Sequence, residues 1–251
     1  MELLLAMMVI VIAFAAAFVD VMVGGGGLIM VPALAALGMP ILTVIGTNRL
    51  YVVAFSLTGM LNYLRKKVRL NLKLVAGFAI LRVAGSAAGS VFVLSIPSDA
   101  VRGMVVFLMI GAIATIFFLR SKKKLAHSKP EKITYVIAGL AILVVGLYEG
   151  VVGGGGGTIT RVVLTLLLGF AMLDAALADL AMSILSSLAS SIIFILNGVV
   201  DYQLLLPMLA GGIMGAFSGS HVAVEKGNAW VQNLLYVAVV ALLVKLLLFH
   251  G

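Results

Sequence analysis

The amino-acid sequence predicts an all-α polytopic membrane protein with about eight transmembrane segments in two four-segment repeats, each with a glycine-broken first helix. Composition supports the membrane class, because 63% of the 251 residues are hydrophobic and only 10% are charged, which is more apolar surface than a soluble domain buries. A run of glycines occurs twice inside apolar sequence, at 24–27 and at 153–157. Each run follows an acid, Asp20 or Glu149, by about one helical turn, so the two halves share one unusual pattern.

The apolar runs give the individual segments, since a transmembrane helix needs about 20 predominantly apolar residues. The first run lacks the basic region and the small-residue cleavage site of a signal peptide, so we expect it to be retained as the first span. The expected segments are 3–23 with a continuation at 28–37, 41–63, 74–95, 101–119, 133–152 with a continuation at 158–169, 172–196, 203–223 and 229–249.

A single clearly polar stretch divides the chain into a first membrane repeat, 1–120, a basic cytoplasmic linker, 121–132, and a second membrane repeat, 133–251. A shift of about 130 positions relates the two halves. It aligns Gly24 with Gly153, Leu37 and Gly38 with Leu168 and Gly169, and the pair Gly85 and Gly89 with the pair Gly215 and Gly219. We interpret the last two pairs, which are GxxxG patterns, as faces on which helix backbones pack closely.

Lysine and arginine cluster in two short segments, 65–69 and 120–132, within a chain of net charge +8. Short basic segments at the ends of apolar spans are topology signals, so we expect both in the cytoplasm and expect no nucleic-acid partner. If 3–37 and 133–169 cross the membrane fully, the repeats are parallel and both termini are inside. If each folds back at its glycines, the repeats are inverted and both termini are outside. The acidic turn at Asp201, equivalent to the basic 65–69 turn, favours inversion without deciding the question.

The glycine runs are the first candidate site. Several glycines in a row unwind a helix, and an unwound backbone inside a bilayer must be buried or line a cavity. The helix that follows has free amides and a partial positive charge, which suit an anion, and paired breaks of this kind mark transporter substrate sites. The alternative is a hinge in which glycine serves only close packing. Neither run precedes Gly-Lys-Ser/Thr or lies in a βαβ pattern, which excludes a nucleotide-binding loop. The expected donors are Gly24, Gly25, Gly26 and Gly27, then Gly154, Gly155, Gly156 and Gly157 with the Thr158 hydroxyl.

Polar residues in the second segment form the next candidate. Thr47, Asn48 and Arg49 place a hydroxyl, a carboxamide and a guanidinium together, which gives several donors for an oxyanion. The alternative for Arg49 is a side chain that reaches the outer interface from a position near the start of the segment. Arg82 and Arg161 are the other arginines within apolar sequence, and each is expected either to contact substrate or to form a structural ion pair.

Three intramembrane acids are candidates for proton coupling: Glu149, Asp20 and Asp179. Ionisable residues at membrane depth are rare and are usually functional. The alternative for Asp20 and Glu149 is to cap freed backbone amides or to pair with the arginines. The sequence has no cysteine, no His-Glu metal cluster and no Ser-His-Asp set at a common depth, so we expect no metal, no cofactor and no enzymatic activity.

Several motifs carry a family resemblance. The first half contains FVDVMVGGGGLIMVPAL from Phe18 to Leu34, then Gly46-Thr-Asn48, then Tyr63-Leu-Arg-Lys-Lys-Val68. The second half contains GLYEGVVGGGGG at 146–157, then Ser186-Ser-Leu-Ala-Ser190 and Gly198-Val-Val200. Together these motifs resemble the TauE/SafE family of sulfite and organosulfonate exporters over nearly the whole chain.

The resemblance implies two four-segment repeats, a homodimer in the lipid bilayer, and residence in the inner membrane of a bacterium or the plasma membrane of an archaeon. It also implies a small sulfur-containing anion as substrate, exported in a step coupled to protons or to the membrane potential. The sequence departs from the family in two places. Arg49 replaces a lysine and keeps its charge, whereas Asp179 and its neighbours replace a second Thr-x-Lys motif whose basic residue is lost.

These observations lead to the hypothesis of a secondary transporter that exports sulfite or an organosulfonate bound between the paired half-helices. Alternating access would move one repeat against the other. Two alternatives stay open: a passive anion channel, which would conduct faster and without coupling, and a non-transporting membrane scaffold. The intramembrane arginines argue against the scaffold, which has no evident use for them.

Overall fold

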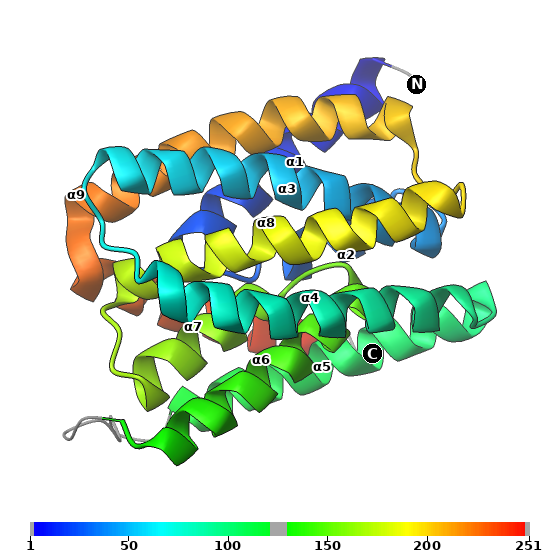
Figure 1. The fold of residues 1–251 in the computed structure, drawn as a ribbon. Helices are drawn as coiled ribbons and strands as arrows, with labels where there is room; N and C mark the ends of the chain where they lie inside the picture. The colour runs from blue at the N-terminus through cyan, green and yellow to red at the C-terminus, as the bar shows by residue number, and fades with distance from the viewer. Residues whose placement is uncertain (1–2, 121–129, 249–251) are drawn as a thin grey trace.

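The computed structural model describes residues 3–120 and 130–248, and every regular element within these residues is a helix (Figure 1). The side chains of residues 112–120, 228 and 232–248 lie outside the described part. The elements are α1 (Leu3–Val23), α2 (Gly27–Ala36), α3 (Ile41–Arg65), α4 (Leu72–Leu94), α5 (Ser98–Arg120), α6 (Lys132–Val152), α7 (Gly156–Leu167), α8 (Met172–Leu196) and α9 (Tyr202–Leu248).

Six of these helices are long and apolar enough to cross a membrane: α1, α3, α4, α6, α8 and the Tyr202–Gly227 part of α9. The chain is therefore a multi-pass membrane protein. The predicted segments 203–223 and 229–249 form one element, α9, which bends at Gly227, where the backbone is non-helical with φ 78°. The predicted spans at 101–119 and 229–249 stay predictions, because many of their side chains lie outside the described residues. The basic linker 121–132 lies mostly outside them as well.

Both predicted glycine breaks are present. The first separates α1 from α2, with Gly24 and Gly25 at φ 79° and 82°. The second separates α6 from α7, with Gly153 and Gly155 at φ 88° and 93°. Left-handed backbone of this kind is accessible to glycine without steric cost and is costly for other residues, so the sequence explains why both helices end at these positions.

Contacts between helices fix their relative directions. Tyr51 on α3 donates to the Ala13 carbonyl on α1, and Tyr63, three turns later, donates to the Val21 carbonyl. Contacts that advance together along both sequences mean that α1 and α3 run in the same direction. Because α3 starts at the end of the bundle where α1 starts, the chain must return across the bundle through α2. The first glycine-broken segment therefore folds back.

The second half runs in the opposite direction. Along α8, Leu180 packs near Gly59 of α3, whereas Phe194 packs near Gly46, so the two helices are antiparallel. Contacts of Arg82 with Asp179, and of the serines that follow on each helix, make α4 parallel to α8. α4 and α6 are closely paired, and they also run parallel to each other. Of the two arrangements that the sequence leaves open, the structure has the one in which the halves are inverted.

Small residues bring two pairs of helices into backbone contact. On α4, Gly85 and Gly89 pack against the Leu143 and Leu147 carbonyls of α6, and on α9 Gly215 packs in the same way against Phe14 of α1. These contacts confirm the packing interpretation of the GxxxG patterns. They also hold the N-terminal helix of each half against the other half.

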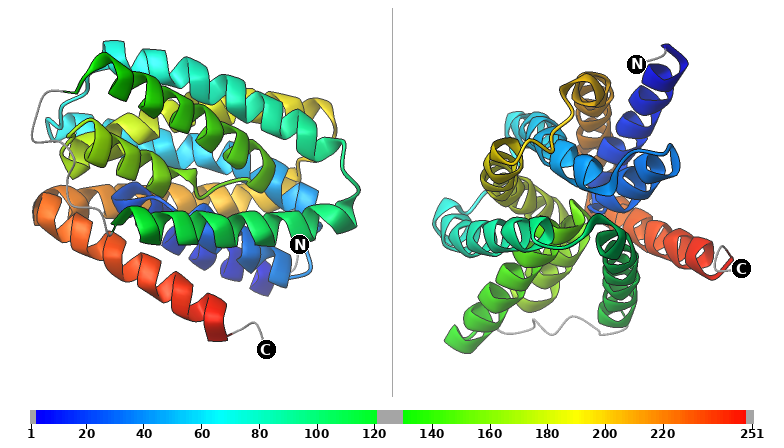
Figure 2. Two further views of the ribbon diagram at one scale, coloured as in Figure 1. Left: turned by 90° about the horizontal axis from the view of Figure 1, so that it is seen from below. Right: turned by 90° about the vertical axis from the view of Figure 1, so that its right-hand side faces the viewer.

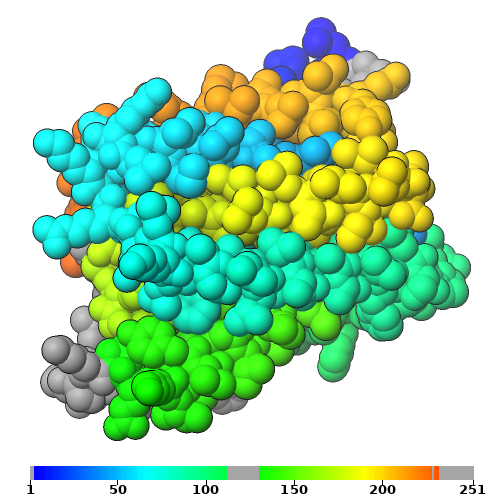
Figure 3. Space-filling model, in the orientation of Figure 1, coloured from blue at the N-terminus to red at the C-terminus, as the bar shows by residue number. Residues whose placement is uncertain are grey.

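The apolar core follows these pairings. One cluster of buried side chains joins α1, α2, α3, α5 and α9 and also includes residues of α4, α6, α7 and α8. A second cluster lies among α4, α6, α7 and α8 alone. Figure 3 shows α3, α8, α4 and α6 lying side by side over one face of the molecule. The left-hand view of Figure 2 shows α4 beside α6 along one edge of the molecule and the last part of α9 along the opposite edge.

Candidate functional site

The two glycine breaks meet in the middle of the molecule. A Cβ atom added to Gly24 would lie 2.6 Å from the carbonyl carbon of Gly157, and one added to Gly27 would lie 2.5 Å from the Gly154 Cα. The Thr158 hydroxyl donates across the junction to the Val23 carbonyl at 3.3 Å. The predicted backbone donors of both halves thus form one buried cluster, which only glycine permits.

Arg49 is buried beside this junction without a charged partner. Its side chain comes from α3 and the residue is 1% exposed, so the interfacial position that the sequence allowed does not apply. Its Nη1 lies 3.3 Å from the Ser187 hydroxyl of α8, whereas Nε and Nη2 have no hydrogen-bond partner. None of the ion pairs formed by the described residues includes Arg49. An unpaired guanidinium in a protein interior is costly unless an anion joins it.

Other polar atoms near Arg49 are also unsatisfied. Asn48 donates from Nδ2 to the Gly153 carbonyl at the second break, while its Oδ1 is buried without a partner. The Tyr148 hydroxyl, 3.1 Å from the place a Cβ on Gly155 would take, is also buried without a partner. Thr47 differs, since its hydroxyl accepts from the backbone N–H of Asp201 at 2.9 Å. Buried polar groups are normally satisfied, so this cluster is suited to a ligand with both acceptor and donor atoms.

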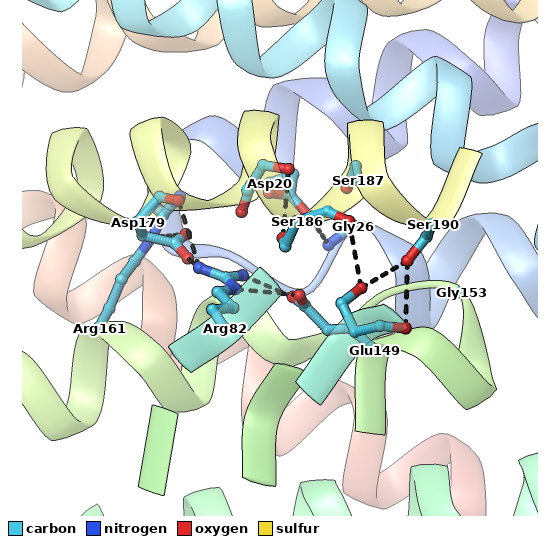
Figure 4. Close-up of polar contacts among 12 residues, drawn as sticks. Asp20, Gly26, Arg82, Glu149, Gly153, Arg161, Asp179, Ser186, Ser187 and Ser190 are labelled. Carbon is cyan, nitrogen blue, oxygen red and sulfur yellow. Dashed lines mark hydrogen bonds and ion pairs between the residues drawn. The ribbon is translucent and has the colours of Figure 1, made fainter. Parts of the chain in front are cut away.

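Arg82 and Arg161 belong to a buried ion-pair network (Figure 4). Arg82 of α4 binds both carboxylate oxygens of Glu149 on α6, at 2.6 and 3.0 Å. It also binds Asp179 of α8 at 2.8 Å, and Arg161 of α7 binds the other oxygen of Asp179 at 3.0 Å. Two cations thus balance two anions, and this is the structural ion pairing that was one of the two expectations for both arginines.

Asp20 has a different environment. It is half-buried near the end of α1, and its Oδ2 accepts from the Gly26 N–H at 2.7 Å, so it caps the start of α2. None of the ion pairs of the described residues includes it. Glu149 also lies against the start of its half-helix, since a Cβ on Gly156 would meet its Oε1 at 2.5 Å. The capping alternative for Asp20 and the pairing alternative for Glu149 are therefore both present.

Ser187 and Tyr148 are site residues that the sequence analysis did not single out. Ser187 belongs to a polar face of α8 on which buried serines recur at helical spacing, at Ser183, Ser186, Ser187, Ser190 and Ser191. That period of three to four residues was the available signal. Tyr148 carried no comparable signal, because its role depends on the turn of the following glycines. Within the described residues, no three His, Asp or Glu side chains gather as a metal site.

The chain is similar to known proteins over most of its length. Residues 9–246 match the family described as "Sulfite exporter TauE/SafE". A "Probable membrane transporter protein" of Haemophilus influenzae is 32% identical over 227 residues, which is 90% of this chain and 88% of the relative. "Probable membrane transporter protein ORF9" of Sinorhizobium is 31% identical, with 94% and 90% of the two chains covered. "Probable membrane transporter protein YfcA" of Escherichia coli K12 is 27% identical, with 94% and 87% covered. No solved structure matches the chain significantly.

Proposed function

The chain belongs to the sulfite exporter TauE/SafE family of membrane transporters, and from this premise we propose that it is a secondary transporter that exports a small sulfur-containing oxyanion. Sulfite and organosulfonates are the substrates in view. The site is the junction of the two glycine breaks, and the membrane is the cytoplasmic (inner or plasma) membrane of a prokaryote. The family and the named relatives indicate transport rather than enzymatic activity.

The observation that carries the proposal is the unpaired guanidinium of Arg49. A buried charge without a partner is unfavourable, and intramembrane arginines mark ion pathways. A sulfite or sulfonate group supplies the negative charge and the acceptor oxygens that Arg49 Nε and Nη2 lack. Its hydroxyl or substituent would face the Asn48 Oδ1 and the Tyr148 hydroxyl, which are also unpaired.

The other residues that we predicted to bind the substrate have different roles in this proposal. The glycine backbone amides at 24–27 and 154–157 and the Thr158 hydroxyl supply neutral donors at two helix starts. Thr47 holds the α8–α9 turn against α3 and supports the site from outside. Arg82 and Arg161 act mainly through the positive field of their ion-pair network. Glu149, Asp20 and Asp179 are the acids through which a proton could couple to transport.

Alternating access follows from two inverted repeats. The opposite directions of the halves and the matched contacts of α1 with α9 and α4 with α6 support a duplicated architecture of eight segments, with repeats 1–120 and 133–251. The basic segment 65–69 then faces the cytoplasm together with the 121–132 linker. A homodimer is expected for the family, and each protomer would carry its own central site.

The test is sulfite efflux from liposomes that contain purified protein, with and without an imposed proton gradient. Wild-type protein is compared with Arg49→Gln, which removes the charge, and with Arg65→Gln, which removes an exposed arginine from the same helix. We expect efflux by wild type and Arg65→Gln and background efflux by Arg49→Gln. All three proteins should elute as one sharp peak in size-exclusion chromatography.

Three results would contradict the proposal. Sulfite efflux at the wild-type rate by Arg49→Gln would mean that Arg49 is not part of the site. Wild-type efflux too fast for a carrier and indifferent to any gradient would favour a channel. Absence of efflux for sulfite and for sulfoacetate would argue against both substrates and would favour a scaffold.

A further inference from the structure

The Asp20 carboxylate lies at the start of α2, one of the two helix starts at which we place the transported anion. Its Oδ2 accepts a hydrogen bond from the Gly26 N–H at 2.7 Å, and Gly26 is the N-cap residue of α2. A Cβ on Gly26 would lie 2.9 Å from this oxygen, so the carboxylate packs directly on the residue. An N–H group that already donates to a carboxylate is not free for a second anion. Substrate and Asp20 must therefore exclude each other at the start of α2.

Asp20 differs from Glu149 and Asp179 because it takes part in none of the ion pairs of the described residues. Glu149 and Asp179 are each held by arginine side chains at 3.0 Å or less. Charges from three other helices act on it: Glu149 of α6, Arg161 of α7 and Asp179 of α8. Tyr51 of α3 is a further electrostatic neighbour. Two of these neighbours are negative, and Arg161 is the cation.

Arg161 offers a second place for the Asp20 carboxylate. The residue is fully buried, and its Nη1 donates to the carbonyl of Val21, the residue that follows Asp20. Its Nε is committed to Asp179, but its Nη2 is buried without a hydrogen-bond partner. Nη1 of Arg161 thus reaches the end of α1, and Nη2 of the same guanidinium has no hydrogen-bond partner among the described residues.

We propose that Asp20 is a tethered competitor of the transported anion. When the substrate binds Arg49 and the Gly26 amide, the Asp20 carboxylate moves to Arg161 Nη2, and its return to Gly26 expels the substrate. This inference rests on the proposed function and assigns to Asp20 a role in substrate release. No covalent bond changes and no proton is required.

A competitor is needed because the site would otherwise bind the anion too tightly to release it. An unpaired arginine and free helix amides in a low-dielectric interior hold an oxyanion strongly, because charged hydrogen bonds are worth more there than in water. A transport site must bind firmly enough to load and weakly enough to unload. After the substrate leaves, a competing carboxylate satisfies one of these donors, the Gly26 amide, so the empty site does not leave that amide unpaired.

The test measures sulfite efflux kinetics for Asp20→Asn in the liposome assay. Asparagine keeps the size and an oxygen that can accept from Gly26, but it lacks the competing charge. We expect KM to fall by roughly tenfold or more, the size expected when a charged hydrogen bond is exchanged for a neutral one, and kcat to fall because release loses its competitor. Asp99→Asn, at an exposed acid near the start of α5, is the matched control and should change neither constant.

A second variant keeps the inference falsifiable if Asp20→Asn fails to fold. Arg161→Lys keeps a positive charge beside Asp179 but lacks the Nη2 donor, so Asp20 stays at Gly26 and KM should rise. An unchanged or raised KM in Asp20→Asn would overturn the inference. If Asp20 only caps α2, the substitution should change only the stability of the protein. If Asp20 only carries a proton, the substitution should change only the dependence of efflux on the proton gradient. Unchanged KM in Arg161→Lys would overturn it as well. No wild-type efflux above that of Arg49→Gln would overturn the proposed function itself, which is a separate outcome.

Discussion

Three arginines lie buried in the described membrane helices, and their surroundings divide them into two groups. Arg82 and Arg161 are neutralised by Glu149 and Asp179. Arg49 has one long hydrogen bond to a serine and takes part in none of the ion pairs of the described residues. Removing one partner of a buried ion pair is costly, because the other charge is left uncompensated. A buried charge that has no partner already lowers the stability of the protein. The same residue type therefore forms ion pairs in two places, and in the third it is the residue that we propose binds the ligand.

This division predicts opposite effects on stability. Arg82→Gln strips Glu149 and Asp179 of a shared cation and should lower stability by about 3–5 kcal/mol. Arg49→Gln removes an uncompensated charge and should leave stability unchanged or raise it. Thermal unfolding of the purified proteins in one detergent measures the difference. A loss of stability in Arg49→Gln as large as that in Arg82→Gln would mean that Arg49 has a structural partner in the empty protein.

The sequence identified the charged residues of the site but not their pairing. Arg82 meets Glu149 and Asp179, which are 67 and 97 positions away, and no local pattern indicates which acid meets which base. Arg49 was recognised from the Thr47-Asn48-Arg49 triplet, yet its lack of a partner is visible only when all the other pairs are known. The position of the Tyr148 hydroxyl was not predictable either, because it depends on the turn that the following glycines make.

At the scale of the elements, the glycine breaks serve two purposes. They let the backbone take left-handed angles, and they let the two breaks touch. The two effects are separable, because Gly24 and Gly38 have nearly the same φ, 79° and 84°, but a Cβ on Gly38 would meet nothing within 4 Å. Gly24 faces the backbone of Gly157 instead.

Alanine at each position should therefore cost different amounts. Gly38→Ala carries only the left-handed strain of about 1–2 kcal/mol. Gly24→Ala carries that strain and also forces the two breaks apart, so it should lower the unfolding temperature much more and abolish sulfite efflux. Parallel thermal melts and efflux assays measure both effects. Equal melting temperatures for the two variants would contradict the close contact of the breaks.

A second pair of variants tests the small-residue contacts between helices. A Cβ on Gly215 would lie 2.9 Å from the carbonyl carbon of Phe14, whereas one on Gly77 would lie in open space. Gly77→Ala should stabilise α4 by up to about 1 kcal/mol through helix propensity, and Gly215→Ala should destabilise the pairing of α9 with α1. The comparison is again a thermal melt. Stabilisation by both substitutions would mean that α1 and α9 are less close than the structure has them.

For the whole molecule, the long apolar segments were predictable and their directions were not. Length and hydropathy located the helices to within a few residues, because each must span the same thickness of hydrocarbon. Direction depends on charge asymmetry between the turns, and the second half has little beyond Asp201, Glu225 and Lys226. The hydrogen bonds of Tyr51 and Tyr63 with α1 give the helix directions that those turns do not indicate.

Inversion of the halves predicts the accessibility of two related positions. Lys66 and Asn197 are both exposed, end equivalent helices about 130 residues apart, and lie at opposite ends of the bundle. Because the sequence has no cysteine, Lys66→Cys and Asn197→Cys each give a single thiol. In intact cells, a membrane-impermeant maleimide should label Asn197→Cys and should label Lys66→Cys only after permeabilisation. Labelling of both from outside would contradict the inverted arrangement.

The central claim, that Arg49 completes an anion site at the junction of the glycine breaks, is tested most directly by equilibrium binding of radiolabelled sulfite to the purified protein. The account predicts one sulfite per chain for wild type and for Arg65→Gln, and none for Arg49→Gln at the same concentrations. Undiminished binding by folded Arg49→Gln protein would contradict it.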